Sequence, residues 1–460
     1  MSPTHPYDVW KEVLVYGLGA SGQAAARFLC RRGVRVVGVD RRPVAELALG
    51  ELTGVDDFEV FTTGEPNSLP AGIDAVVVSP GVPLDRPLIT DARRLSVPVL
   101  AEVELASAYV EGPVVGITGS NGKSTTTAMT GALLEASGIA SEVCGNIGVP
   151  LISVVDGSPG RVFVVELSSF QLEAVATLRP KAAALLNVSP DHLDRHGSVE
   201  GYLEAKTRLF ARQEEGDFAV LNADDPLVRD IGTRARRRYF SRHRRVEDGC
   251  YLDGDLVVEV DAEGSKEELF RRSDVNQPGE HNLENAMAAA LLARALGASP
   301  AVFGRTLAGF EGLPHRMQSV ARVDGVHWVD DSKGTNVGAV VMSLAGLEDG
   351  SVHLILGGRG KGESFAPLAG IVSRKVRCLY LIGEAADEIR RELAQSAPSV
   401  AIEMAGTLPE AVARSRDSAK VGDTVLLSPA CTSFDQYTDF AERGRHFQEL
   451  VLDLVGGVSG

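Results

Sequence analysis

The residues most able to do chemistry lie in a glycine-rich turn at 116–126, which reads GITGSNGKSTT and follows the apolar run PVV. In such a turn the backbone amides bind phosphate oxygens, a lysine reaches the β- and γ-phosphates and a hydroxyl ligates Mg²⁺. Lys123 and Ser124 are that lysine and hydroxyl. The strict GxxxxGK[ST] pattern is not met, because Ile117 stands five residues before Gly122. The order of strand, turn and helix still predicts a nucleoside triphosphate site rather than a loop with an incidental lysine.

A second glycine-rich turn, at Gly17, Gly19 and Gly22, follows the apolar run VLVY and precedes a helical segment. The next apolar run ends at Asp40, whose carboxylate is placed to accept a hydrogen bond from a ribose hydroxyl. Glycines at this spacing let backbone amides approach a diphosphate at the start of a helix. The motif specifies a diphosphate beside a sugar, and it leaves NAD open as one of the nucleotides that could carry them.

Lys206 stands where an apolar residue is expected. In the helical segment SVEGYLEAKTRLFA, an apolar stripe runs through Val199, Leu203 and Phe210, and Lys206 occupies the position that completes it. Burial disfavours the charged form of an amine and so makes the amine more nucleophilic. The alternative is a lysine whose stem lines the core while its ammonium group reaches solvent.

Two further polar residues follow apolar runs. Glu166 ends the run VFVVE, which predicts a carboxylate at the carboxyl edge of a sheet, near the start of the helix after the triphosphate turn. Such a carboxylate suits Mg²⁺, although Glu166 could instead cap the helix that follows. His192 comes with Asp191 after the run AALLN and suits a second metal ion; a lone histidine is more often structural.

The elements that must position these residues are short, β-branched runs that end in glycine or a polar residue. Each predicts a buried parallel strand that leads into a helix. Polar and apolar residues alternate over 246–275, which predicts a small antiparallel excursion. The runs predicted as parallel strands are 13–17, 76–81, 114–119, 162–166, 183–187, 353–358, 379–383 and 424–429.

The 460 residues suffice for two to four domains, and glycine and proline mark two joints, at 111–113 and 313–314. We therefore expect an α/β protein of three domains. Residues 1–111 are expected to be Rossmann-like, and residues 112–313 to resemble a P-loop ATPase with a mostly parallel sheet. Residues 314–460 are expected to form a second Rossmann-like domain.

Composition excludes several classes of protein. With 62 acidic and 46 basic residues, the formal net charge is −16, which disfavours binding to nucleic acid or to anionic membranes. The chain contains no apolar run long enough to span a membrane, and its first residues lack the layout of a signal peptide. Five scattered cysteines predict reduced, mostly buried thiols. We expect a cytoplasmic protein that acts as a monomer.

One basic segment runs against this acidic composition. Seven arginines lie in the twelve residues from 234 to 245, in the sequence RARRRYFSRHRR. This segment is the only place where a nucleic-acid site could begin. Because it lies outside every chemical motif, we interpret it as a solvated or ion-paired surface.

The triphosphate turn resembles the ATP loop of the Mur ligase and folylpolyglutamate synthase superfamily, whose members couple ATP cleavage to amide-bond formation. Further motifs of that superfamily follow in its order and cover nearly the whole chain. They are GNIG (145–148), ELSSFQ (166–171), NVSPDHLDRH (187–196), NADD (222–225), HNLEN (281–285), LPHR (313–316), DSKGTN (331–336), GGRGK (357–361) and SPACTSFD (428–435).

Among the Mur ligases, ELSSFQLE, DSKGTN and SPACTSFD are most similar to the branch that adds D-glutamate to UDP-N-acetylmuramoyl-L-alanine. The resemblance implies ATP, two Mg²⁺ ions and a lysine carbamylated by CO₂ that ligates the second ion. It implies small-molecule substrates only, with catalytic roles for Lys123, His192 and Lys206 and metal ligands at Ser124, Glu166, His192 and carbamylated Lys206.

The resemblance also implies three sets of binding residues. For ATP these are Gly119, Ser120, Asn121, Gly122, Lys123, Ser124, Thr125, Thr126, Asn282, Asn285, Arg316 and Asp331. Asn282 and Asn285, which we expect at N-cap-like and N3 positions of the helix NAMAAALLARALG, would also reach the adenine. For the UDP-substrate they are Gly19, Ala20, Ser21, Asp40, Arg42, Ser79, Gly81, Asn146 and His192. For D-glutamate they are Lys333, Thr335, Lys361, Ser433 and Phe440.

Three alternatives remain at this stage. The first turn by itself would suit an NAD-dependent dehydrogenase, but that function leaves the triphosphate turn and Lys206 unused. Another Mur ligase or a folylpolyglutamate synthase would share the centre of the chain and differ in the third block. A non-catalytic nucleotide switch would keep the triphosphate turn without needing Lys361 and Ser433.

Overall fold

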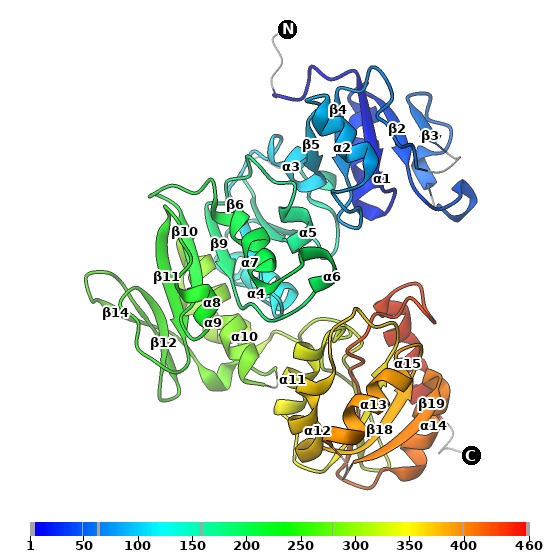
Figure 1. Cartoon of the computed structure of the whole chain (residues 1–460). Coiled ribbons are helices and arrows are strands. Elements are labelled where there is room, and N and C mark those ends of the chain that lie inside the picture. The colour runs from blue at the N-terminus through cyan, green and yellow to red at the C-terminus, as the bar shows by residue number, and fades with distance from the viewer. Residues whose placement is uncertain are drawn as a thin grey trace. The chain divides into compact units, whose positions relative to one another are not determined.

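The computed structural model of the chain describes residues 5–47, 49–61, 65–156, 160–277, 279–397 and 400–456. Its strands form three separate sheets of five, nine and six strands, each with helices packed against it (Figure 1). The predicted α/β class is therefore confirmed. All eight runs predicted as parallel strands coincide with strands of these sheets.

The first sheet is fully parallel and has the order β3-β2-β1-β4-β5, as in a Rossmann-like domain. Its strands are apolar because helices cover the sheet and leave little of it to solvent. The strands are β1 (Glu12–Tyr16), β2 (Arg35–Val39), β3 (Phe58–Phe61), β4 (Ala75–Val78) and β5 (Val99–Ala101). The helices are α1 (Ala20–Arg31), α2 (Pro87–Arg94) and α3 (Glu102–Ser107), with the 3₁₀ turns η1 (Val44–Glu46) and η2 (Gly50–Leu52).

The second sheet has the order β14-β13-β12-β11-β10-β9-β6-β8-β7. Its strands are β6 (Val114–Thr118), β7 (Ser141–Gly145), β8 (Val162–Glu166), β9 (Ala182–Leu185), β10 (Phe218–Asn222), β11 (Arg236–Ser241), β12 (Gly249–Asp253), β13 (Leu256–Val260) and β14 (Lys266–Arg271). The pairs from β7 to β12 are parallel, whereas β12, β13 and β14 pair antiparallel. The antiparallel excursion predicted from the alternating residues is thus confirmed.

The next helices lie in the sequence between β6 and the first strand of the third sheet. They are α4 (Lys123–Ala136), α5 (Ser169–Leu172), α6 (Leu193–His196), α7 (Val199–Thr207), α8 (Pro226–Arg229), α9 (Glu280–Ala295) and α10 (Phe303–Ala308). Short 3₁₀ turns are η3 (Leu151–Ser153), η4 (Arg208–Phe210), η5 (Arg272–Asp274) and η6 (Pro300–Val302).

The third sheet has the order β15-β16-β20-β17-β18-β19 and is parallel except for the β15–β16 pair. Its strands are β15 (Gln318–Val323), β16 (Val326–Asp330), β17 (Val352–Gly357), β18 (Val376–Ile382), β19 (Ala401–Gly406) and β20 (Thr424–Leu427). Its helices are α11 (Val337–Ala345), α12 (Ala369–Lys375), α13 (Ala386–Ser396), α14 (Leu408–Ser418) and α15 (Phe440–Gly456), with the 3₁₀ turn η7 (Ala366–Leu368).

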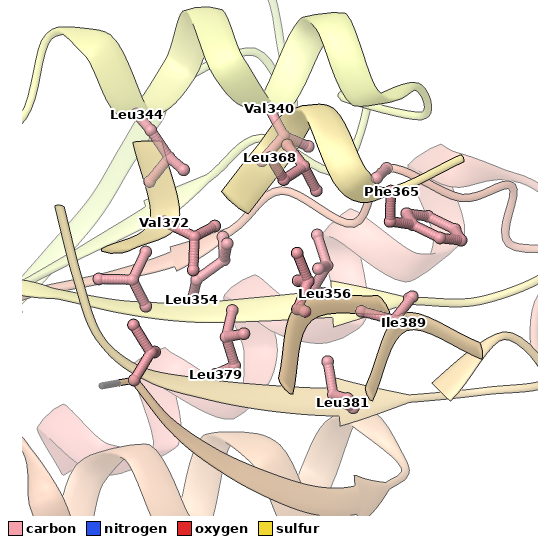
Figure 2. Close-up of a cluster of buried hydrophobic side chains, with 14 of the residues drawn as sticks. Val340, Leu344, Leu354, Leu356, Phe365, Leu368, Val372, Leu379, Leu381 and Ile389 are labelled. Carbon is pink, nitrogen blue, oxygen red and sulfur yellow. The ribbon is translucent and has the colours of Figure 1, made fainter. Parts of the chain in front are cut away.

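Both faces of this third sheet are covered. Figure 2 shows Val340 and Leu344 of α11 above Leu354 and Leu356 of β17, within a cluster that also includes residues of α12 and α13. On the other face, α14 and α15 contribute a second buried cluster that includes Phe447. A sheet buried on both faces needs apolar side chains at successive positions, which is why these strands read as continuous apolar runs.

The chain divides into two compact units. The first comprises residues 1–188, 200–274 and 284–308, and the second comprises residues 189–199, 275–283 and 309–460. Two short segments of the central region therefore group with the third sheet. The proposed domain limits at 111/112 and 313/314 stay predictions; the first falls between α3 and β6, and the second between α10 and β15.

Two other expectations concern the whole chain. All five cysteines are free, and four of them are buried, as the composition predicted. Among the helices that the structure describes, each is too short or too polar to cross a lipid bilayer.

Candidate active site

The triphosphate turn connects β6 to α4 in a conformation that requires glycine. Gly122 precedes the helix with φ of +84°, and a Cβ atom there would lie 2.2 Å from Oδ1 of Asn285. A side chain at this position would therefore destabilise the turn in two ways, through an unfavourable left-handed backbone and through a steric clash with Asn285. The Nζ of Lys123 donates to the carbonyl oxygens of Gly119 and Ser120, each at 2.9 Å. Amides at the start of a 14-residue helix and an adjacent ammonium group form an anion-binding arrangement.

Asn187 holds this turn in place and was not assigned a role from the sequence. Its Oδ1 accepts from the amide of Asn121 at 2.8 Å, and its Nδ2 donates to the carbonyl oxygen of Asn121 at 3.1 Å. The backbone carbonyl of Asn187 also accepts from the amide of Ser120 at 3.0 Å. The only signal in the sequence was its place directly after an apolar strand, in the motif NVSPDH. Its side chain can match both backbone groups of one residue because an amide carries a donor and an acceptor.

Glu166 ends β8 beside the triphosphate turn. It pairs with Ile117 of β6, and the amide of Leu167 donates to the carbonyl oxygen of Ile117 at 2.8 Å. The Glu166 side chain is buried, and its Oε1 accepts from Nδ2 of Asn146 at 2.8 Å. The alternative role as a helix cap falls to Ser168, which forms a capping box with Gln171 at the start of α5.

These oxygen donors fit a divalent cation. The hydroxyl of Ser124 lies in the first turn of α4, the helix that follows β6, and the carboxylate of Glu166 ends β8, which pairs directly with β6. Hydroxyl, carboxylate and phosphate oxygens are the ligands that Mg²⁺ prefers. Within the described residues, no three His, Cys, Asp or Glu side chains gather into a metal-binding group. A metal in this region would thus rely on phosphate oxygens as well as on protein ligands.

Lys206 is buried, as its place in the apolar stripe predicted. Only 1% of its surface is exposed, and its Nζ donates to the carbonyl oxygen of Gly119 at 2.8 Å. The Nζ also lies 4.2 Å from the ring centroid of Tyr202. The alternative of a lysine that reaches solvent is wrong. Because Gly119 belongs to the triphosphate turn, the amine of Lys206 lies at that turn.

The two asparagines of HNLEN lie inside a helix rather than at its start. α9 begins at Glu280, so Asn282 and Asn285 are its third and sixth residues, and the prediction that they occupy N-cap and N3 positions was wrong. The helix extends further because its early turn packs inward: both asparagines are buried. Oδ1 of Asn285 accepts from the hydroxyl of Thr126 at 3.3 Å, which joins α9 to α4.

The first glycine-rich turn has the close packing that its spacing predicted. Gly19 precedes α1, which begins with Ala20 and Ser21, and a Cβ atom on Gly22 would lie 1.9 Å from the carbonyl oxygen of Gly17. The hydroxyl of Ser79, which follows β4, donates to that same carbonyl at 2.6 Å. Gly81 lies two residues further on in the same connection. The ends of β1 and β4 therefore meet at the start of α1, and the diphosphate site predicted there stays a prediction.

Asp40 is held by the chain's own groups. Its Oδ2 accepts from the amide of Leu18 at 2.7 Å, and its Oδ1 accepts from the amide and Nε of Arg42 at 2.9 and 3.0 Å. Burial raises the pKa of Asp40, but these hydrogen bonds and the charge of Arg42 outweigh burial and hold the pKa at about 2. Asp40 is therefore an ionised acceptor that links the turn to Arg42.

Lys333 and Phe440 come together in the second unit. The Nζ of Lys333 lies 3.8 Å from the ring centroid of Phe440, a cation–π contact. Thr335 follows in the same loop, and its backbone amide donates a hydrogen bond to the carbonyl oxygen of Lys333 at 2.8 Å. Ser433 is buried in the loop after β20.

Lys361 is linked to the segment that carries His192. Its Nζ lies 3.5 Å from Oδ1 of Asp191, whose Oδ2 accepts from Nδ2 of Asn336 at 3.1 Å. Nε2 of His192 is 3.7 Å from Oδ2 of Asp191, and the His192 backbone has φ of +55°. Residues from three sequence motifs thus meet around one carboxylate.

Asp331 is buried, and burial raises its pKa to about 6, although hydroxyl donors and the charge of Arg316 act in the opposite direction. Its Oδ2 accepts from the hydroxyls of Ser343 and Ser428, each at 2.7 Å. The predicted contacts of Asp331 with ribose and of Arg316 with phosphate stay predictions.

Arg443 and His315 support the same loops, and neither was assigned a role from the sequence. Arg443 is fully buried and donates to the Oγ and carbonyl oxygen of Ser332, at 3.0 and 2.9 Å, and to the carbonyl oxygen of Cys431 at 3.2 Å. Nδ1 of His315 lies 2.6 Å from Oδ2 of Asp330. A Cβ atom on Gly444 would meet the His315 ring at 2.1 Å. The presence of Gly444 inside the C-terminal helix α15 is the one trace of this packing in the sequence.

The arginine-rich run is mostly paired. Of its seven arginines, five form ion pairs: Arg236 and Arg238 with Asp248, Arg238 also with Glu259, Arg242 with Glu284, Arg244 with Asp224 and Arg245 with Asp253. The prediction of an ion-paired surface is confirmed for these five residues.

Three family models match the chain in sequence order. They are the Mur ligase MurD-like N-terminal domain at residues 11–101, the Mur ligase middle domain at 117–293 and the Mur ligase glutamate ligase domain at 315–431. The first and third matches contain the first and third sheets, and the middle match contains the second sheet except for the first three residues of β6.

Similar proteins cover nearly the full length. The UDP-N-acetylmuramoylalanine–D-glutamate ligase of Pelotomaculum thermopropionicum is 43% identical over 97% of this chain and 98% of its own, and that of Myxococcus xanthus is 45% identical over 96% and 98%. Among solved structures, the UDP-N-acetylmuramate–alanine ligase of Thermotoga maritima has a TM-score of 0.60 at 20% identity over 96% of this chain and 99% of its own. A pseudomurein peptide ligase of Methanothermus fervidus has a TM-score of 0.60 at 18% identity over 96% and 100%. These structures share the fold.

Proposed function

The chain belongs to the Mur ligase family, and on that basis we propose that it catalyses the ATP-dependent addition of D-glutamate to UDP-N-acetylmuramoyl-L-alanine, a step of peptidoglycan precursor synthesis. One observation carries the proposal: relatives named as ligases of this kind are 40–45% identical to the chain over nearly its whole length. Family membership also confirms the resemblance drawn from the sequence motifs. It leaves no role for an NAD-dependent dehydrogenase.

The proposed reaction has two steps. The alanyl carboxylate of the UDP-substrate attacks the γ-phosphorus of ATP, which gives an acyl phosphate and ADP. The amine of D-glutamate then attacks the acyl carbon, and the tetrahedral intermediate collapses to the amide with loss of inorganic phosphate and a proton. Positioning and charge stabilisation are the main requirements of such a phosphoryl transfer.

The triphosphate turn would hold ATP through the amides of residues 119–126. The Lys123 ammonium group donates to the carbonyl oxygens of Gly119 and Ser120 and so lies close to these amides. It would offset negative charge on the oxygens of the phosphoryl group that is transferred. Bound Mg²⁺ would supply further neutralisation of phosphate charge. We assign Ser124 and Glu166 to hold it, together with His192 and Lys206 for a second ion, and Asn282, Asn285, Arg316 and Asp331 to contact the nucleotide.

The UDP-substrate and D-glutamate would bind to the other two sets of residues predicted from the sequence. The start of α1, with Gly19, Ala20, Ser21, Asp40, Arg42, Ser79, Gly81, Asn146 and His192, would bind the UDP-substrate. Lys333, Thr335, Lys361, Ser433 and Phe440 would bind D-glutamate, whose two carboxylates need cations and hydroxyl donors. We further propose that the protein acts as a cytoplasmic monomer of three domains, with limits near 111/112 and 313/314.

A panel of amino acids tests this function. Purified protein is given ATP, Mg²⁺ and UDP-N-acetylmuramoyl-L-alanine, and phosphate release is measured with D-glutamate, L-glutamate, L-alanine, L-lysine and meso-diaminopimelate. D-Glutamate should be clearly preferred. Preference for another acceptor would assign the chain to a different ligase of the family.

Lys206 is proposed to react with CO₂, its neutral amine forming a carbamate with release of one proton. The support is a buried amine at the triphosphate turn. Lys206→Ala should reduce phosphate release by about a hundredfold, the range for losing a metal-site partner, and added acetate or formate should restore part of it. Lys266→Ala, at an exposed lysine, is the control. Full activity of Lys206→Ala without an additive would contradict the proposal.

A further inference from the structure

Two glutamates that no proposed substrate needs are buried in the short helix α3. Glu102 and Glu104 are each 2% exposed. Figure 1 places α3 directly after β5, where the chain leaves the first sheet for the second. Buried carboxylates are costly unless other groups satisfy them. Within the described ranges neither forms an ion pair, and their partners come from the region around the second sheet.

Glu104 binds the segment that leaves α5. Its Oε1 accepts from the amide of Thr177 at 2.7 Å and from the Thr177 hydroxyl at 2.5 Å. Its Oε2 accepts from the amides of Ala176 and Leu178, at 3.1 and 3.2 Å. The amide of Ala101 adds a backbone hydrogen bond to the carbonyl oxygen of Ala174 at 3.0 Å. One carboxylate thus fixes three successive amides that follow α5, the helix that begins three residues after Glu166.

Glu102 binds a different segment that leads to the same place. Its Oε1 accepts from the amide of Ile152 at 2.7 Å, in η3. η3 follows the loop that carries Asn146, whose Nδ2 donates to Oε1 of Glu166 at 2.8 Å and whose amide donates to the Glu166 carbonyl at 2.9 Å. A Cβ atom on Gly145 would lie 2.3 Å from that carbonyl, so this loop packs directly against the end of β8.

From these contacts we infer that Glu102 and Glu104 are positioning residues that fix Glu166 for metal binding and tie it to the first sheet. One glutamate holds the segment after Glu166, and the other holds the loop whose asparagine contacts the Glu166 carboxylate. Because both glutamates lie on one helix turn after β5, a shift of the first sheet would be transmitted to both segments. The inference rests on the proposed function only in taking Glu166 as a metal ligand.

The test measures metal binding as well as activity. In the full-length protein, Mn²⁺ affinity in the presence of ADP is measured by electron paramagnetic resonance for wild type, Glu102→Ala, which removes the acceptor of the Ile152 amide, and Glu104→Gln. Each substitution should weaken Mn²⁺ binding by about tenfold, as for other residues that orient a metal ligand. The Mg²⁺ concentration for half-maximal phosphate release should rise in parallel, while KM for D-glutamate stays within about twofold, because the amino-acid set lies outside these contacts.

Three features make the test decisive. Glu111→Gln, at an exposed glutamate shortly after α3, should leave Mn²⁺ binding unchanged. Thr177→Val keeps the Glu104 carboxylate and removes one of its donors, so it should cause a smaller loss in the same direction even if Glu104→Gln does not fold. Wild-type Mn²⁺ affinity in Glu102→Ala and Thr177→Val would overturn the inference. The Mn²⁺ measurement needs no amino acid, so it stands even if the panel rejects D-glutamate as the acceptor.

Discussion

At the scale of single residues, the charged groups of the candidate site are fixed by the chain itself. The Lys206 amine donates to the carbonyl oxygen of Gly119, and the Glu166 carboxylate accepts from the side-chain amide of Asn146. The Asp40 carboxylate accepts from Arg42 and from the backbone amide of Leu18. A buried charge is tolerated only with such partners. The same partners fix the side chains before a substrate arrives, which reduces the ordering that binding must produce.

A substitution at Gly122 tests whether the close packing of the triphosphate turn matters for ATP binding. Gly122→Ala should weaken ATP binding by about tenfold or more, since a Cβ atom would lie 2.2 Å from Oδ1 of Asn285 and relieving such a clash costs about 1–3 kcal/mol. Calorimetric titration with ATP measures the effect. The control is Gly138→Ala, because Gly138 has a similar φ of +77° with open space around its Cβ position. Equal ATP affinities of the two variants would contradict the role given to Asn285.

At the scale of elements, buried ion pairs join strands and helices. Arg238 of β11 lies 2.9 Å from Asp248 and 2.8 Å from Glu259 of β13, and Glu259 also pairs with Arg294 of α9 at 2.7 Å. The antiparallel excursion is therefore connected to the parallel strands and to α9 by charge as well as by its ladder. The arginine-rich run has a structural role at these positions.

Arg238→Met should destabilise the protein by about 3 kcal/mol, because it leaves two largely buried carboxylates without one of their partners. Urea denaturation measures the loss. Arg237→Met, at the exposed neighbour in the same strand, should change stability by no more than about 0.5 kcal/mol. Similar values for both variants would mean that the ion pairs contribute no more than a surface contact.

The helix α3 should also give the protein a pH-dependent stability. Burial raises the pKa of Glu102 from 4.5 to about 7, so the folded protein keeps a proton that the unfolded chain loses between these values. This stabilisation is complete below pH 4.5 and is lost as the pH rises through 7. Glu102→Gln removes it, so wild type should lose about 3 kcal/mol relative to the variant between pH 4.5 and 7. Urea denaturation at several pH values measures this difference, which should be absent for Glu111→Gln.

At the scale of the whole molecule, an acidic chain gathers cations where three anionic substrates are proposed to bind. The formal net charge of −16 accompanies local groups such as Lys123, Lys333 and Lys361. Net charge thus disfavours nucleic acid without excluding small anions, because a few fixed cations dominate the field at short range. The two compact units carry different sets: the triphosphate turn lies in the first, and Lys333, Lys361 and Ser433 lie in the second.

This division predicts that substitutions in one unit will affect the binding of one substrate and leave the binding of another unchanged. Lys361→Met should raise KM for D-glutamate by about ten- to a hundredfold, the effect of losing a hydrogen bond to a charged group, and leave ATP binding unchanged. Lys123→Met should weaken ATP binding directly. Steady-state kinetics and calorimetry measure both, with Lys420→Met at an exposed position as control. A loss of ATP affinity in Lys361→Met would contradict the assignment of Lys361 to the amino acid.

The sequence by itself determined the elements and the kinds of chemistry. Runs such as VFVVE and VLVY predicted buried strands because β-branched residues favour strands, and the glycines after VLVY predicted a turn because glycine tolerates a left-handed backbone. The apolar stripe indicated an inward position for Lys206 but left open a lysine whose ammonium group reaches solvent. Family motifs then identified which nucleotide chemistry those turns serve.

Only the tertiary structure decided which groups meet. Asn187 on the triphosphate turn, Asn285 against Gly122 and Arg443 under two loops are contacts between residues far apart in the chain. The start of α9 at Glu280 also depends on packing, since propensity favoured a later start at the asparagines. Local patterns record burial and backbone preference, whereas the partner of a polar group depends on which strands and helices the fold brings side by side.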